Sequence, residues 1–325
     1  MIGAVSGMNN EGLTVTINAG KSKIPLVAKT PISLVTREIL QYAKNIDEAI
    51  AIAKKRAVFV SESIMVGSAA DHKAVILEVS PKKFGVYEVP NSNQLICSNH
   101  FQSSAYKTDA RNQYQIANSH SRYRYQRMEQ LIGATPKLDP PGAAAILRNK
   151  DGLNDLQLGY GNEKALNQLR AHHAVIFKPE KRLVWVSSNP YQLGEFVCYD
   201  LNKVFGADSN GTHGFSVQYG DLNIPKDTFA DSPAYFAFQV YKTEDKKMDR
   251  FLKSENGLDT IFANNYIASN PDFWEVYYKL GKYYYGQKEY KQATKFFETA
   301  LTKEITTVPD KQKTEKYLKK SKRKS

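Results

Sequence analysis

The chain has 325 residues, of which 42% are hydrophobic and 24% are charged. A chain of this length can bury a sizeable core, and its composition is ordinary for a globular protein and excludes a disordered one. No apolar run approaches the roughly eighteen residues that a membrane-spanning helix needs, so the sequence predicts no membrane span. The chain shows no secretory leader. A cytoplasmic protein is therefore the default, and an envelope or periplasmic one is the alternative if a leader lies upstream.

The net charge of +12 is concentrated near the C-terminal end. Residues 311–325 hold eight lysines or arginines against one glutamate. Such tails can bind polyanions, but we expect residues 309–325 to be a solvated, frayed basic tail and expect no nucleic-acid partner. The two cysteines, Cys97 and Cys198, lack the spacing of a disulfide framework or a metal site, so we interpret both as buried thiols. The sequence predicts no metal and no cofactor.

The first twenty residues predict two short β-strands joined by a turn. Turn-forming residues occupy positions 9–12, and apolar residues then alternate with polar ones over 13–18, as in a strand with one buried face. A chain that begins in the middle of a sheet suggests the second part of a longer fold.

Two amphipathic helices are predicted next. The first covers 30–45, with Thr30 as N-cap and Pro31 at the first helical position. The second is short, covers 48–56 and is capped by Asp47. Together they predict a helical layer over a sheet.

Residues 57–101 change to the pattern of short strands. Four runs rich in β-branched and aromatic residues are separated by turn-forming residues, which predicts an antiparallel meander with its last strand at Gln94–Cys97. A helix follows over 119–132, with Ser119 or Ser121 as its cap.

The next region returns to strands. A short helix is predicted around Ala143–Arg148, and residues 172–201 predict a hairpin followed by a third strand. Residues 202–245 are rich in Gly, Asp and Asn, and we expect them to be irregular before the helical end of the chain.

Aromatic and small residues over 277–305 have the spacing of a tetratricopeptide repeat. The positions are Tyr277, Leu280, Gly281, Tyr284, Tyr290, Ala293, Phe297, Ala300 and, in place of the usual proline, Ile305. One repeat cannot bury its own apolar face, so we expect this segment to pack on the preceding domain, and a partner helix around Asp245–Asn270 is compatible with it. The pattern favours a docking or capping element over an independent peptide-binding groove.

Asparagine and arginine side chains at strand ends and at a helix start are the candidates for chemistry. Asn18 ends the second predicted strand, and Asn99 follows the last strand of the meander. Three arginines, Arg122, Arg124 and Arg127, begin the next helix. An asparagine amide can donate to a developing oxyanion, a contribution of roughly 2.7–4 kcal/mol per donor, and arginine can hold a carboxylate. Spacing alone favours ordinary turn residues.

The segment SGMNNEGLTVTINAG resembles a strand motif of the penicillin acyltransferase and choloylglycine hydrolase group of N-terminal-nucleophile hydrolases. Three further segments agree in order and spacing with the acyl-coenzyme A:6-aminopenicillanic acid acyltransferase branch of that group. They are TPISLVTREIL with DEAI, LICSNHFQS, and HHAVIFKPEKRLVWVSSNP. The resemblance covers residues 1–201.

The resemblance implies an α+β fold, namely an αββα sandwich of two antiparallel sheets between helical layers, incomplete at its N-terminus and followed by the tetratricopeptide-like helical hairpin. The expected domains are a hydrolase-like acyltransferase domain over 1–240, a helical segment over 241–308 and the tail over 309–325. It also implies autoproteolysis before a cysteine, whose thiolate is the nucleophile and whose α-amino group is the base. Acyl groups of amides or esters would pass through a thioester to water or to an amine.

Site roles are carried over by motif. Asn99 would be an oxyanion-hole donor, and Asn18 would be a second donor or a substrate contact. Arg122 or Arg127 would support the nucleophile end of the site. Cys97 cannot replace the nucleophile, because an internal residue has no free amine to act as base.

Members of the family carry the nucleophilic cysteine before the SGMN segment, where this chain has only residues 1–5. We therefore expect the chain as written to be inactive. The expected partners are a small amide or acyl substrate, the missing N-terminal portion of the same precursor, and a protein at the helical repeat. The alternative function is a non-catalytic docking protein that uses the enzyme scaffold and the repeat.

Overall fold

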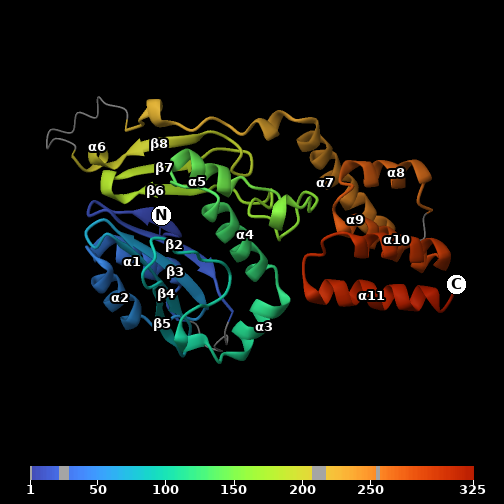
Figure 1. Cartoon of the computed structure of the whole chain (residues 1–325), viewed down its shortest axis with the longest axis horizontal. Coiled ribbons are helices and arrows are strands. Elements are labelled where there is room, and N and C mark those ends of the chain that lie inside the picture. Colours follow the sequence, from blue (N-terminus) through green and yellow to red (C-terminus); the bar gives the residue numbers. More distant parts are fainter. Residues whose placement is uncertain (1, 22–28, 207–216, 254–256) are drawn as a thin grey trace.

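The structure, a computed structural model, describes residues 2–21, 29–206, 217–253 and 257–325. Figure 1 shows two sheets with helices around them in the N-terminal part of the chain and a stack of helices in the C-terminal part. The chain is thus a mixed helix-and-sheet protein, as the sequence predicts.

Five antiparallel strands form the first sheet, in the order in which they occur in the chain. They are β1 (Ser6–Met8), β2 (Leu13–Ala19), β3 (Glu62–Ser68), β4 (Lys73–Val79) and β5 (Phe84–Tyr87). The register places Asn18 opposite Ser63 and Ser63 opposite Glu78. These three residues therefore form one row across the sheet. The predicted opening hairpin is confirmed, and so is the meander from β3 to β5.

Two helices, α1 (Ile32–Tyr42) and α2 (Ile46–Lys55), pack against this sheet and share one apolar core with it. Leu13 and Val15 of β2 are fully buried in that core. Because successive side chains of a strand point to opposite faces, Asn18 lies on the other face, away from the helices. The candidate site is therefore on the face of the sheet that α1 and α2 do not cover.

Both helix caps differ from the prediction. The N-cap of α1 is Pro31, because the backbone of Thr30 is engaged in a β-bridge. The N-cap of α2 is Asn45, whose side chain accepts a hydrogen bond from the Glu48 backbone N–H at 2.9 Å. Asp47 instead lies within the first turn of the helix. Asn45 and Glu48 have the spacing of a capping box, which the predicted cap at Asp47 does not take into account.

Residues 88–103 are irregular, and the strand predicted at Gln94–Cys97 is wrong. The backbone of this segment bonds to side chains in place of a neighbouring strand. For example, the side-chain amide of Gln102 donates to the backbone carbonyl of Ile96 at 2.9 Å. We call residues 94–103 the site loop, because it lies on the polar face of the first sheet.

Helices α3 (Ala110–Asn118) and α4 (Ser121–Gly133) follow the site loop. The N-cap of α4 is His120, not Ser119 or Ser121. The Ser119 hydroxyl nevertheless accepts from the Ser121 backbone N–H, the first of α4, at 3.1 Å, and it donates to a carbonyl of α3 at 2.7 Å.

Three antiparallel strands form the second sheet: β6 (Val175–Lys178), β7 (Leu183–Ser187) and β8 (Phe196–Asp200). This confirms the hairpin and third strand predicted over 172–201. Helix α5 (Pro140–Leu147), the predicted short helix, packs on one face of this sheet. The buried core between them includes Ala144, Ile176, Trp185 and Cys198. Figure 1 shows the two sheets stacked one above the other.

The C-terminal helices are α7 (Pro233–Phe251), α8 (Thr260–Ser269), α9 (Trp274–Gly286), α10 (Tyr290–Thr302) and α11 (Val308–Lys322). Residues 202–245 are expected to be irregular, but they contain part of α6 (Leu201–Phe205) and the start of α7. The Ser232 side chain caps α7 by accepting from the Tyr235 backbone N–H at 3.2 Å. A serine before a proline is an ordinary helix start signal, so α7 begins earlier than expected. Residues 207–216 of the stretch expected to be irregular lie outside the described residues.

Helices α9 and α10 form a hairpin with a close contact at Gly281 (Figure 1). A Cβ atom at this position would lie 2.7 Å from the Phe297 ring. Leu280, Ala293, Phe297 and Ala300 have no exposed surface. Helices α7 and α8 lie where a partner helix around Asp245–Asn270 is expected.

The basic tail is a helix, so the expectation of a frayed end is wrong. Thr307 caps α11 and accepts from the Asp310 backbone N–H at 3.2 Å. Tyr317 stacks on Phe297 of α10, with ring centroids 5.6 Å apart. The lysines of α11 lie on its exposed surface. The helix has a start signal, and its other face has the packed side chains of Tyr317 and Leu318 and the buried Thr314 and Ser321.

The described residues contain neither a membrane-spanning helix nor a cluster of metal ligands. None of their helices is long and apolar enough to cross a bilayer. Nor do they bring three or more His, Cys, Asp or Glu side chains together as a metal site would require.

Candidate functional site

The candidate site is built on the polar row of the first sheet and on the site loop that covers it. Glu78 anchors the loop: its carboxylate is fully buried and accepts from the backbone N–H groups of Gln102 and, at 3.0 Å, Ser103. Burial raises the pKa of Glu78 above its ordinary value, while these two hydrogen bonds oppose the shift. The anchor places Cys97 and Asn99 over the end of β2.

A pH-dependent stability follows from the burial of Glu78. Because its pKa is raised on folding, the folded protein binds this proton more tightly than the unfolded chain does. The contribution to stability is therefore complete below the ordinary pKa of 4.5 and is lost as the pH rises through the raised pKa. We expect the free energy of unfolding of the wild type, minus that of Glu78→Gln, to fall with rising pH. Urea unfolding at several pH values measures it, and a constant difference would contradict the prediction.

Asn99 is held against the end of β2. Its Nδ2 donates to the Ala19 carbonyl at 3.0 Å, and Ala19 directly follows Asn18. Its Oδ1 accepts from Nη2 of Arg124. The structure thus brings the two predicted asparagines to one strand end, although they are far apart in the sequence.

Cys97 lies beside Asn18. The Cys97 thiol donates to the Ser98 carbonyl at 3.6 Å, and the nearby Asn18 side chain acts to lower the pKa of the thiol. Burial is the main cause that raises the pKa of this thiol to about 11, and the charge of Glu78 adds to the shift. The thiol is therefore protonated at neutral pH, and a thiol is a weak nucleophile compared with its thiolate.

The second cysteine is remote from this row. Cys198 is fully buried in the core of the second sheet, and burial raises its pKa to about 11 as well. The interpretation as a buried thiol is confirmed for Cys198, whereas Cys97 is half-buried. Neither thiol has the lowered pKa of a reactive cysteine.

The three arginines of α4 have different positions. Arg122 is exposed. Arg127 is almost completely buried, and it bonds Asp155 at 2.6 Å and Asn149 at 3.1 Å. Neither has a hydrogen bond to Asn99; that contact belongs to Arg124.

Arg124 is one of the three candidates, but the sequence does not favour it. A signal is present, because Ser121, Arg124 and Arg127 repeat every three residues and so share one face of the helix. All three are buried, whereas Arg122 lies between them on the exposed side. The periodicity separates Arg122 from the other two, but it does not tell Arg124 from Arg127.

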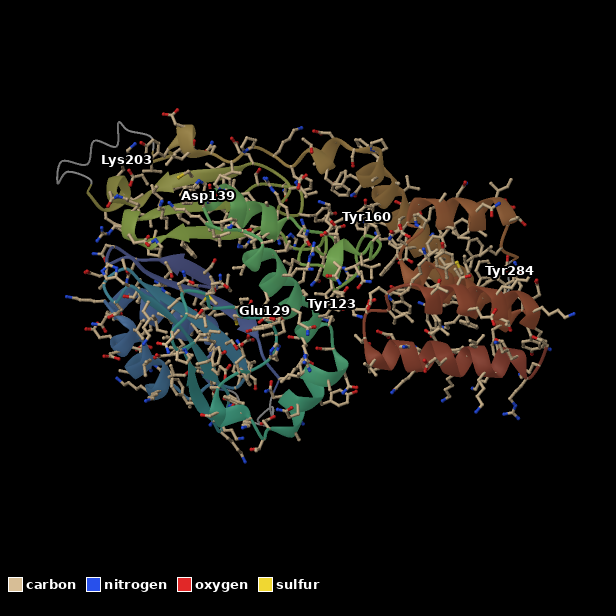
Figure 2. All side chains as sticks on the ribbon, viewed as in Figure 1. Tyr123, Glu129, Asp139, Tyr160, Lys203 and Tyr284 are labelled. Atoms are coloured by element: carbon tan, nitrogen blue, oxygen red, sulfur yellow. The ribbon has the colours of Figure 1, made fainter. Side chains whose placement is uncertain are left out.

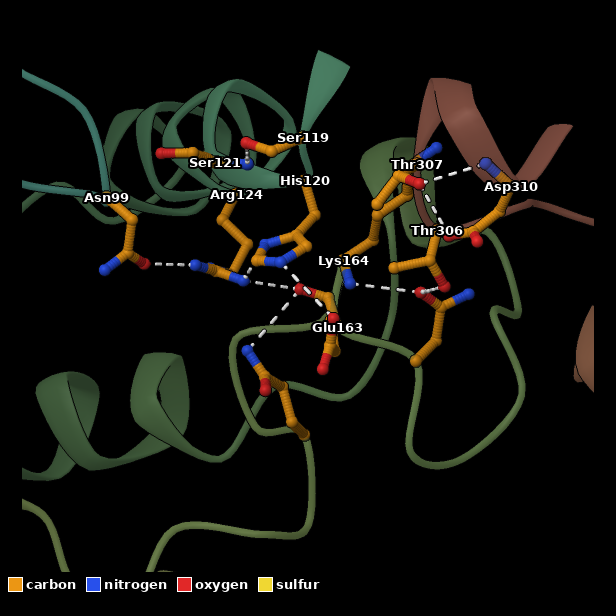
Figure 3. Close-up of polar contacts among 12 residues, drawn as sticks. Asn99, Ser119, His120, Ser121, Arg124, Glu163, Lys164, Thr306, Thr307 and Asp310 are labelled. Carbon is orange, nitrogen blue, oxygen red and sulfur yellow. Dashed lines mark hydrogen bonds and ion pairs between the residues drawn. The ribbon is translucent and has the colours of Figure 1, made fainter. Parts of the chain in front are cut away.

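Arg124 is surrounded by polar partners, which Figure 3 shows together. Its Nη1 donates to the Glu163 backbone carbonyl at 2.5 Å and lies 2.5 Å from Nδ1 of His120. The His120 Nε2 lies 3.3 Å from the Glu163 carboxylate and, with a hydrogen bond, lowers the pKa of Glu163. Burial lowers the pKa of Arg124 to about 10, so its guanidinium keeps its charge at neutral pH.

Side chains that the sequence does not single out fasten the site loop to α4. The Ser98 hydroxyl donates to the Ser121 carbonyl at 2.9 Å, and His100 Nδ1 lies 2.8 Å from the Ser121 hydroxyl. Asn112 of α3 exchanges two hydrogen bonds with the backbone of Phe101, at 2.8 and 3.0 Å. These contacts have no motif of their own and depend on the folded loop.

A cavity of about 600 Å³ lies along the same strand as Ser63. Met65 and Gly67 of β3 line it, together with the segment before the site loop and the turn after β6. Met65 is two residues from Ser63 and so shares its face of the sheet. The cavity is large enough for a small organic molecule.

Figure 2 shows how densely side chains fill the space between the two sheets and around α4, where Tyr123 and Glu129 are labelled. Within the described residues, the row of Asn18, Ser63 and Glu78 with Asn99 above it offers amide donors. These amide donors can bind and polarise a carbonyl group.

The comparison with protein families agrees with this geometry. A family model described as acyl-coenzyme A:6-aminopenicillanic acid acyl-transferase matches residues 1–189, which include the first sheet, the site loop, α4 and Glu163. Among solved structures, a variant of the conjugated bile acid hydrolase from Clostridium perfringens is similar, with 12% sequence identity and a TM-score of 0.35. That similarity covers 62% of this chain and 74% of the hydrolase chain. No curated protein matches the chain.

Proposed function

The chain belongs to the acyl-coenzyme A:6-aminopenicillanic acid acyl-transferase family, and from this we propose that its N-terminal part is the scaffold of an amidohydrolase or acyltransferase. The substrate class is a small molecule with an amide-linked acyl group. The acyl group would pass through a thioester on a cysteine to water or to an acceptor amine. The two stacked sheets with helices on them support an αββα sandwich of the N-terminal-nucleophile type.

The observation that carries the proposal is the meeting of Asn18 and Asn99 at the end of β2. The Asn99 amide is 3.0 Å from the carbonyl of the residue that follows Asn18. Two side-chain amides at one place can donate to the oxyanion that forms when a carbonyl is attacked. We assign Asn99 as the oxyanion donor and Asn18 as the second donor or a substrate contact. Support of the nucleophile end by Arg122 or Arg127 stays a prediction.

The nucleophile would come from a cysteine other than Cys97 and Cys198. Both thiols have a pKa near 11, so few molecules carry the thiolate at neutral pH. Both are also internal residues, without the α-amino group that serves as the base in this class. We therefore propose that the 325 residues bind substrate but do not turn it over. A cysteine-bearing part of the same precursor, with its autoproteolytic site, would be the partner that supplies the nucleophile.

The helical segment supports the alternative, a non-catalytic docking role. The tetratricopeptide-like spacing over 277–305 coincides with the hairpin of α9 and α10. Phe236, Val240 and Ile261 of α7 and α8 are exposed apolar residues at which a protein could dock. A docking protein would bind its protein partner without any affinity for small amides.

Calorimetric titration with penicillin V and with N-phenoxyacetyl-glycine tests the proposal. We expect binding without hydrolysis, and a loss of affinity of about fivefold in Asn99→Ala, because one hydrogen bond contributes about 1 kcal/mol. Asn118→Ala is the matched control, since the half-buried Asn118 donates only to a carbonyl of its own helix, α3, and this variant should bind like the wild type.

Two results would contradict the proposal. Hydrolysis by the 325-residue protein that disappears in Asn99→Ala would show that the chain contains its own nucleophile. Absence of binding for every N-acyl amide would favour the docking protein instead.

A further inference from the structure

We propose that Arg124 and Asn162 are positioning residues through which the C-terminal helices hold Asn99 in the candidate site. The inference rests on the proposed function for the role of Asn99, but its evidence is a continuous set of hydrogen bonds. They run from the site loop through α4 and residues 158–164 to the loop between α10 and α11 (Figure 3).

The first step is the orientation of the Asn99 amide. A guanidinium can only donate hydrogen bonds and a backbone carbonyl can only accept them. Arg124 therefore fixes the oxygen end of the amide, and the Ala19 carbonyl fixes the nitrogen end. The second N–H of the amide remains for a substrate. Without Arg124, rotation of the amide would be opposed by one hydrogen bond only.

The second step is the position of Arg124. Arg124 is only 8% exposed, so its guanidinium is held by other groups of the protein and not by solvent. Its Nη1 donates to the Glu163 carbonyl at 2.5 Å, and the Glu163 carboxylate faces His120, the other neighbour of Nη1. The place of Glu163 therefore determines where the guanidinium lies.

The third step is the attachment of Glu163 to the C-terminal helices. Its neighbour Asn162 has no exposed surface. Asn162 Nδ2 donates to the Glu304 carbonyl at 2.9 Å, and its Oδ1 accepts from the Thr306 hydroxyl at 3.1 Å. On the other side, Lys164 pairs with the Glu304 carboxylate. Glu163 is thus held between two residues that both bond the loop between α10 and α11.

The contacts continue on both sides of this point. The Thr306 hydroxyl accepts from Trp274 Nε1 of α9 at 2.9 Å. The backbone of Tyr160 exchanges two hydrogen bonds with the side chain of Asn270, at 3.0 and 2.8 Å. Two separate C-terminal segments, the loop after α10 and Asn270 at the end of α8, therefore bond the segment that carries Glu163. The C-terminal helices therefore support the candidate site in addition to forming their own packed unit.

The side-chain amide signals of Asn99 in a proton–nitrogen NMR spectrum test the inference, because they report its two hydrogen bonds directly. Asn99→Asp identifies the signals by removing them. In Arg124→Lys we expect both proton signals to shift by more than about 0.1 ppm and their hydrogen exchange to become faster, because the bond to the oxygen end is lost. Asn162→Ala should cause a smaller shift in the same direction, although Asn162 does not touch Asn99.

Two matched controls separate positioning from a general loss of stability. Arg127→Lys changes an equally buried arginine of the same helix that bonds Asp155 instead. Ser321→Ala removes a buried hydroxyl of α11 that bonds only its own helix. Both should leave the Asn99 signals in place. If Asn162→Ala does not fold, Thr306→Val removes one of the two hydrogen bonds between Asn162 and this loop with little change in shape.

Asn99 signals that stay at the wild-type position in Arg124→Lys, or in both Asn162→Ala and Thr306→Val, would overturn the inference. Equal shifts in the two controls would also overturn it. The experiment uses no substrate, so its result is independent of the proposed function. Ligand binding by a protein whose Asn99 signals ignore these variants would refute only the support by the helices, and shifts without any ligand binding would refute only the proposed function.

Discussion

Replacing Lys279 by methionine is expected to lower the free energy of unfolding by about 3 kcal/mol. The Lys279 side chain has 10% exposure, and its Nζ lies 2.7 Å from Asp245, 2.9 Å from Asp249 and 3.8 Å from Glu275. Burial, more than the neighbouring charges, raises the pKa of Glu275. Without the ammonium group three carboxylates would face one another in a partly dry space, and an unpaired buried charge is far more unfavourable than an exposed one.

Lys247→Met is the matched control for this experiment. Lys247 has an exposed side chain and forms an ion pair with one carboxylate only, 2.8 Å from Glu244, in the same group of helices. Its replacement should change the free energy of unfolding by no more than about 0.5 kcal/mol. Urea unfolding followed by circular dichroism measures both variants. Equal losses of unfolding free energy in the two variants would contradict the prediction. Lowering the pH should reduce the difference between the two variants, because the carboxylates around position 279 then take up protons.

The second large effect is expected for Gly159→Ala, which should lower the free energy of unfolding by about 3 kcal/mol or more. Gly159 has φ of +74°, a conformation that side chains with a Cβ rarely adopt. An added Cβ would lie 2.3 Å from the backbone nitrogen of Phe273. Backbone atoms cannot move aside as a flexible side chain can, so the segment that carries Glu163 would have to part from α9.

Gly161→Ala separates the two causes of this effect. Its φ is +90°, but the nearest atom to an added Cβ is a ring carbon of Phe238 at 3.5 Å. Only the conformational strain remains, and we expect a loss of about 1–2 kcal/mol. Thermal and urea unfolding of the two variants provide the comparison. Equal losses would show that the contact with Phe273 is not tight.

The sequence predicts well where one side of a strand faces a core. The alternation over 13–18 correctly indicates a strand with one buried face, because burial by α1 and α2 selects apolar residues at every second position. The same rule fails at Gln94–Cys97. A short apolar run has the composition of a strand, but its backbone here bonds to the Gln102 side chain, and composition does not reveal such a partner.

The candidate site is predictable only in part, for a related reason. Asn18 and Asn99 follow from the resemblance, and the structure brings them together. The choice among the arginines of α4 cannot be made from the sequence, because Arg124 and Arg127 share a helix face and differ only in what lies opposite. Those partners, Asn99 and Asp155, come from other parts of the chain.

Glu163 and Asn162 cannot be found from the sequence at all. Their segment has no regular periodicity, and the partners of Asn162, at positions 304 and 306, lie 142 and 144 residues further along the chain. A polar residue in a loop is usually solvated, so nothing in its neighbourhood distinguishes a buried one. Only the folded contact with the C-terminal helices reveals their position.

The stack of C-terminal helices has two different ends, because its last helix has a charged outer surface. Helix α11 turns Tyr317 inward and its ammonium groups outward, at the end of the stack farthest from α8 (Figure 1). Another helix could not settle there without dehydrating those groups. At α7 and α8 the exposed Val240 and Ile261 offer an apolar surface instead. The two ends of the stack therefore differ in surface chemistry, apolar at α7 and α8 and charged at α11.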